Sequence, residues 1–109
     1  MTKDIASKEL KHFDICGSQI DHAEQGKMFG HPVYKLNKKA FVCYFHGDMV
    51  FKLDPETKES ALKLKGSMLF DPSGKKRPMK EWVQLTYAHK KKWQELSIAA
   101  ADYVLSLQK

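Results

Sequence analysis

The sequence predicts an α+β fold, a two-layer sandwich in which a roughly five-stranded antiparallel sheet has helices packed on one face. From residue 27 the apolar side chains repeat with the period of two that is typical of strands, and short turn sequences interrupt the pattern. Before this region and at the end of the chain, apolar side chains follow helical spacing instead. Strands joined by hairpins, with helices set apart from them, give the expected order α-β3-α-β2-α in one domain over residues 1–109.

The first element expected is a helix over residues 3–20, because Leu10 and Phe13 belong to one apolar stripe there. Three strands follow in the segments PVYKLN, AFVCYFH and MVFKL, with turns at NKK and at the GD of residues 47–48. A further strand around residues 27–29 is an alternative that the pattern leaves open.

The clearest helix boundary lies in DPETKESALKLKG, where Asp54 can cap a helix that has Pro55 at its first position. Gly66 suits the left-handed residue that ends such a helix. SMLF and EWVQLT are then expected as strands. The last element is an amphipathic helix over residues 89–107, with Trp93 on its apolar face.

Composition is that of an ordinary globular protein, because 42% of the 109 residues are hydrophobic and 29% are charged. No apolar run approaches the ~18 residues of a membrane span, and the first ten residues hold no hydrophobic block. The sequence therefore predicts a cytoplasmic protein without a membrane partner, in which Cys16 and Cys43 are free thiols. The formal net charge is +6, and Arg77 is the only arginine among nineteen basic residues. Such a lysine-rich excess fits solubility or weak attraction to polyanions.

The stretch DPSGKKRPMKEW, residues 71–82, allows two interpretations. Its first residues are turn formers, so the leading interpretation is a solvated hairpin loop between two strands. The alternative is a nucleic-acid site, since Trp82 is expected on the sheet face opposite Val83, where it could stack on a base. The cationic residues that would then hold phosphates are Lys75, Lys76, Arg77 and Lys80.

Four motifs together resemble the TfoX N-terminal domain family of bacterial proteins, which is named after a regulator of DNA-uptake competence. They are GKMFG at 26–30, GDMVFKL at 47–53, RPMKEWV at 77–83, and Trp93 followed by EL at 95–96 and YV at 103–104. The matching residues are of types that build turns and packing, not acid–base chemistry: Lys27, Met28, Phe29, Gly30, Pro78, Met79, Trp82 and Trp93.

The resemblance implies a two-layer fold with a curved antiparallel sheet, similar to that of type III secretion chaperones. In the competence regulators a second domain follows this one, and the pair acts in transcriptional activation. This chain ends just after the expected last helix, so the resemblance implies a stand-alone form and the regulatory role does not transfer whole.

No constellation for catalysis or metal binding emerges from the sequence. Cys43 and His46 are three apart on an expected strand and so point to opposite faces. The histidines lack the spacing of a local metal site, although a site assembled from His22, His31 and His46 is an alternative. We therefore expect a non-enzymatic interaction or regulatory domain without a cofactor. A protein partner, including a second copy, is the leading expectation, and nucleic acid is the alternative.

Overall fold

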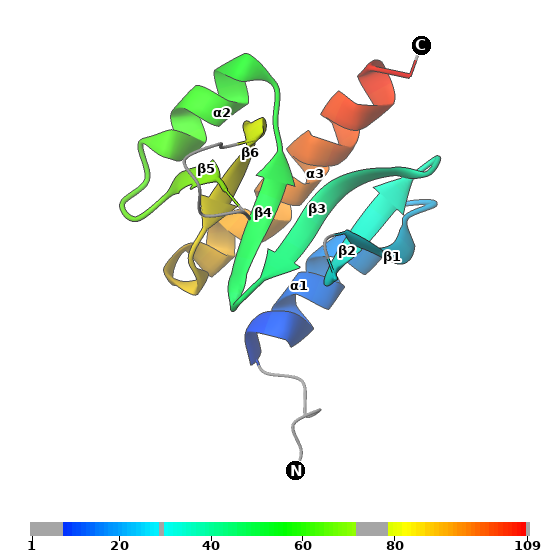
Figure 1. The fold of residues 1–109 in the computed structure, drawn as a ribbon, viewed down its shortest axis with the longest axis horizontal. Helices are drawn as coiled ribbons and strands as arrows, with labels where there is room; N and C mark the ends of the chain where they lie inside the picture. The colour runs from blue at the N-terminus through cyan, green and yellow to red at the C-terminus, as the bar shows by residue number, and fades with distance from the viewer. Residues whose placement is uncertain (1–7, 29, 72–78, 109) are drawn as a thin grey trace.

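The computed structural model of the protein describes residues 8–28, 30–71 and 79–108, with the backbone alone for Met79 and Lys80. Within them, six antiparallel strands form one open sheet in the order β1-β2-β3-β4-β6-β5 (Figure 1). The elements are α1 (Lys8–Ser18), β1 (Glu24–Met28), β2 (His31–Leu36), β3 (Lys39–Phe45), β4 (Asp48–Lys52), α2 (Pro55–Leu62), β5 (Met68–Phe70), β6 (Met79–Leu85), the short 3₁₀ helix η1 (Tyr87–His89) and α3 (Lys90–Ser106).

The predicted α+β class is confirmed, but the predicted count of five strands and the order α-β3-α-β2-α are wrong. The sixth strand is β1, which pairs with β2 from Glu24 opposite Lys35 to Met28 opposite His31. Three of its five residues are exposed, so it lacks the apolar alternation that marks the other strands. The observed order has four strands before α2.

Two tight turns fix the register of the central strands. Asn37 and Lys38 have φ of 50° and 70°, and His46 and Gly47 have φ of 49° and 90°. Positive φ at both central residues matches the right-handed twist of the flanking strands. The second turn therefore lies one residue before the predicted GD, and Asp48 begins β4.

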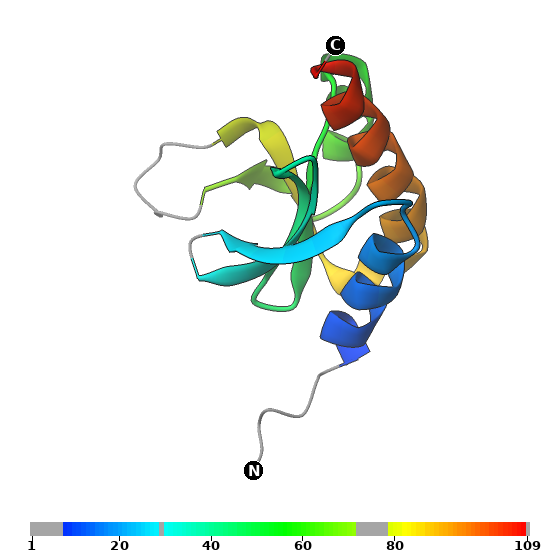
Figure 2. The ribbon, with the colours of Figure 1, turned by 90° about the vertical axis from the view of Figure 1, so that its right-hand side faces the viewer.

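One face of the sheet is sealed by the helices, as Figure 2 shows. α3 packs along β3 and β4, and α1 lies beside α3. The alternation predicted for β6 is confirmed, because Val83 and Leu85 are fully buried in this core with Trp93. Asp54 caps α2 by accepting a hydrogen bond of 3.2 Å from the Thr57 N–H.

The opposite face of the sheet holds a second apolar cluster. Its buried members are Val33, Cys43, Val50, Phe70 and Trp82. Phe45 of β3 meets Phe70 of β5 with ring centroids 5.0 Å apart, although β4 and β6 lie between these strands in the sheet. The sheet must therefore curve strongly away from the helices (Figure 2). Among the described helices, none has the length and apolar character needed to cross a bilayer.

Candidate functional site

The side chains of the residues predicted to bind phosphate do not belong to the described part of the chain. Lys75, Lys76 and Arg77 lie outside the described residues, and Lys80 is described by its backbone alone, in β6. Trp82 does lie on the face opposite Val83, as expected, but it is only 6% exposed and packs in the second apolar cluster. This burial leaves little of the indole accessible for stacking on a base, which was the alternative role given to Trp82.

The matching residues of the four motifs that are fully described lie in β1, in the turn that follows it and in the two apolar clusters. Lys27 is exposed in β1, Met28 packs against the second apolar cluster, and Gly30 has a φ of 77° in the turn to β2. Trp93 is fully buried and donates a hydrogen bond of 3.2 Å from its indole N–H to the Thr86 carbonyl. The motif residues Phe29 and Pro78 lie outside the described residues, and Met79 is described by its backbone alone.

Both cysteines are buried as free thiols. Burial raises the pKa of Cys16 to about 11, against a smaller opposing effect of a hydrogen bond with Ser97, and raises the pKa of Cys43 to about 12. The thiolate is the nucleophilic form of cysteine. Neither side chain is therefore set up as a nucleophile at neutral pH.

The three histidines considered as a metal site do not meet. The rings of His31 and His46 have centroids 5.2 Å apart. His22 lies at the opposite end of the β1–β2 hairpin, beside Asn37 and Lys38, whereas His31 pairs with Met28 at the near end. In the part of the chain that the structure describes, no group of three or more His, Cys, Asp or Glu side chains is placed to hold a metal ion.

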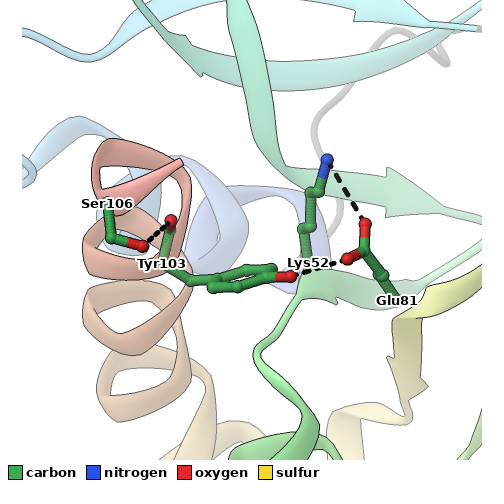
Figure 3. Close-up of polar contacts among 4 residues, drawn as sticks. All are labelled: Lys52, Glu81, Tyr103 and Ser106. Atoms are coloured by element: carbon green, nitrogen blue, oxygen red, sulfur yellow. Dashed lines mark hydrogen bonds and ion pairs between the residues drawn. The ribbon is translucent and has the colours of Figure 1, made fainter. Parts of the chain in front are cut away.

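A polar junction ties the end of α3 to the sheet, as Figure 3 shows. The Tyr103 hydroxyl donates a hydrogen bond of 2.6 Å to Glu81, whose other oxygen lies 3.6 Å from the Lys52 ammonium. The Ser106 hydroxyl donates to the Tyr103 carbonyl at 2.7 Å. The hydrogen bond to Glu81 is the main cause that raises the pKa of Tyr103, with smaller effects of burial and nearby negative charge. The polar groups of the junction are paired with one another by these hydrogen bonds and the ion pair. We therefore assign the junction a structural role, in holding α3 against the sheet.

The most distinctive surface lies at the β1 end of the sheet. A cleft of about 390 Å³ separates α1 from the β1–β2 hairpin, with Leu10 and Phe13 on one wall and Pro32 on the other. The Tyr34 hydroxyl crosses it, donating to Asp14 at 3.1 Å and accepting from the Gln25 amide at 2.9 Å. This polar bridge holds α1 against the hairpin and leaves the outer edge of β1 uncovered by any described element (Figure 2).

The two edges of the sheet differ in a way that matters for association. β5 has only three residues, and its register with β6 is broken between Leu69 and Phe70. β1 has five residues in unbroken register with β2. Short and irregular edge strands resist pairing with other chains, whereas regular ones permit it. No pattern in the sequence predicts this contrast, because it depends on the order of strands in the sheet.

Comparisons of the chain with protein-family models, with curated proteins and with solved structures found no match. The resemblance to TfoX N-terminal domains therefore stays a prediction, and the surfaces described above carry the functional inference.

Proposed function

We propose that the protein is a small, non-enzymatic interaction domain that associates with a second copy of itself through β1. The observation that carries the proposal is the regular outer edge of this strand, at the end of the sheet order. The motifs shared with TfoX N-terminal domains support a regulatory setting for such a domain.

The position of Pro32 in β2 shows which backbone N–H and C=O groups of β1 are available to pair with a second copy. In an antiparallel pair, positions that exchange both hydrogen bonds alternate with positions that exchange none. Lys27 is opposite Pro32, which has no N–H to donate, so Lys27 and Pro32 form a pair that exchanges no hydrogen bond. The N–H and C=O groups of Lys27, and of Gln25 two residues earlier, therefore point away from β2 toward the open edge.

A two-fold axis through Gly26 satisfies all four of these groups. Gly26 then faces Gly26 of the second copy at a position without hydrogen bonds, where the Cα atoms approach most closely, at about 4.5 Å. Gln25 then exchanges two hydrogen bonds with Lys27 of the second copy, and Lys27 exchanges two with its Gln25, which makes four in all. A register that placed Lys27 opposite Lys27 would instead oppose like charges.

The expected association is weak and reversible. Hydrogen bonds contribute about 0.5–1.5 kcal/mol each, so four give about 4 kcal/mol. The loss of translational and rotational freedom on association costs at least about as much, so a Kd of about 1 mM also requires contacts other than these hydrogen bonds. Side-chain contacts beside the strand, including those of α1, would supply these. The complex belongs to the class of small, transient interfaces.

Proline substitution tests the edge directly. Lys27→Pro removes an outward N–H and blocks the edge, while it leaves the hydrogen bonds between β1 and β2 in place. The matched control, Lys27→Ala, removes the same charge but keeps the N–H. Sedimentation velocity at concentrations up to about 1 mM should show association for wild type and Lys27→Ala and none for Lys27→Pro, with unchanged circular dichroism in all three. A wild-type chain that stays monomeric, or a Lys27→Pro variant that associates like wild type, contradicts the proposal.

A further inference from the structure

A dense group of lysines lies where α1 and α3 begin, well away from the predicted 71–82 site. α1 supplies Lys8 and Lys11, and α3 begins with Lys90, Lys91 and Lys92, all of them exposed. The two helices are in contact, and the His12 ring nitrogen lies 2.9 Å from the Lys90 carbonyl oxygen. We call these five lysines, with Tyr87 between them, the basic surface.

The ring of Tyr87 contacts the ammonium groups of two of these lysines, one from each helix. The ammonium groups of Lys8 and Lys90 lie 5.5 Å and 5.0 Å from the centroid of its ring. Tyr87 is itself fixed by an edge-on contact with Trp93, with ring centroids 5.5 Å apart. A lysine from each helix is thus held over one rigid aromatic ring, which brings like charges together in spite of their repulsion.

Among the residues that the structure describes, little neutralises the positive charge of this surface. Lys92 forms an ion pair of 3.8 Å with Glu95. In the described part of the chain, Lys8, Lys11, Lys90 and Lys91 have no carboxylate within ion-pairing distance. Lysines held close together repel one another and do not stabilise the packing of the domain. A bound polyanion would reduce this repulsion.

We propose that the basic surface binds the phosphate backbone of nucleic acid without reading its sequence. Its lysines are spread over two neighbouring helices, an arrangement that suits a linear array of phosphates better than one small anion. Lysine contacts phosphate as a point charge, while base recognition commonly uses the planar fork of arginine. Contacts of this kind position a protein on the backbone and carry no sequence information. The proposal is independent of association through β1.

The test compares three double variants that each remove two positive charges. Lys90→Gln/Lys91→Gln alters the basic surface, and Lys75→Gln/Lys76→Gln alters the site predicted from residues 71–82. Lys38→Gln/Lys39→Gln is the matched control at the far end of α3, where Asn37 donates a hydrogen bond of 2.8 Å to Gln108. Binding to a fluorescent DNA duplex of mixed sequence is measured by anisotropy in 50 mM and 200 mM NaCl, and folding is checked by circular dichroism.

Wild type should bind at the lower salt concentration and lose affinity steeply at the higher one. The Lys90→Gln/Lys91→Gln variant should bind at least about tenfold more weakly in 50 mM salt, with a plot of log K against log salt that is less steep by about 1.8. The other two variants should change the affinity less than about threefold, because they remove the same net charge without removing phosphate contacts. Equal losses in all three variants, a loss confined to the Lys75→Gln/Lys76→Gln variant, or no binding by wild type would each overturn the proposal.

Discussion

Gly17 is the position where a single added methyl group should do most damage to the packing of α1. The residue is buried in the helix, and a Cβ built on it lies 2.3 Å from Cδ1 and 2.6 Å from Cγ of Tyr34. Carbon atoms in contact are normally about 3.5–4.0 Å apart. The ring cannot swing away freely, because its hydroxyl is held by Asp14 and Gln25 at 3.1 Å and 2.9 Å.

Gly17→Ala therefore has two opposite effects on the free energy of unfolding, because overpacking lowers it and the higher helix propensity of alanine raises it. Forcing an extra methyl into a tight core costs about 1–3 kcal/mol, and the pinned ring places this site near the upper end. Replacing glycine by alanine within a helix recovers about 1 kcal/mol. The net expectation is a loss of about 2 kcal/mol in the free energy of unfolding, or roughly 8–16 °C in Tm for a domain of this size.

Urea denaturation of a double-mutant cycle gives the measurement. In a Tyr34→Ala background the obstacle is gone, so Gly17→Ala should become neutral or stabilising there. Ile15→Ala, at a 60% exposed position of the same helix, is the control and should change stability by less than about 0.5 kcal/mol. If Gly17→Ala stabilises the wild-type chain, or costs as much without the Tyr34 ring as with it, the close approach of Gly17 and Tyr34 is not what excludes a side chain.

Three other predictions follow from the titratable groups. Burial, and secondarily the charge of His46, lowers the pKa of His31; the folded state thus resists its protonation, and stability should fall as pH drops below about 6.5, the ordinary pKa. His31→Gln should reduce this fall between pH 7.5 and 5.5 in urea titrations, and an unchanged fall would exclude His31 as its source. Tyr103→Phe removes the 2.6 Å hydrogen bond to Glu81 and should lower the free energy of unfolding by up to about 1 kcal/mol, whereas no change would mean that water replaces it fully. Cys43, with its pKa raised to about 12, should resist iodoacetamide at pH 8 until urea unfolds the chain, and rapid labelling of the native protein, located by mass spectrometry, would contradict its burial.

Local patterns in the sequence were sufficient for most of the fold. Asp54 and Pro55 marked the start of α2 because capping and a fixed φ act within a few residues. Apolar periodicity likewise located α3 and the central strands. β1 is predicted only as an alternative, because its mostly exposed residues show no such period and its place in the sheet depends on pairing with β2.

The candidate surfaces were much harder to predict, because they depend on which elements become neighbours. Trp82 was assigned to the correct face, but that face is covered by its own cluster once the sheet curves and Phe45 meets Phe70. Lys8 and Lys90 are far apart in the sequence, and only the packing of α1 on α3 brings both to the ring of Tyr87. Neither curvature nor helix packing leaves a local signal in the sequence.

The two proposals also make a joint prediction through the geometry of strand pairing. Two copies joined by antiparallel β1 strands share a two-fold axis perpendicular to the sheet, so their helices lie on the same face of the continuous sheet. Both basic surfaces would then lie on that face, related by the axis, and a long duplex could bridge them. Binding at the first surface raises the effective concentration of the duplex at the second.

Lys27→Pro should accordingly weaken binding to a long duplex while it leaves the affinity for a duplex too short to span both surfaces unchanged. Lys27→Ala is again the control, because it removes the same side-chain charge and keeps the edge N–H. Anisotropy titrations with both duplex lengths separate the possible results. Equal loss on the short and the long duplex would show that residue 27 contacts the phosphates itself. No difference between the two variants on the long duplex would show that the basic surfaces act singly.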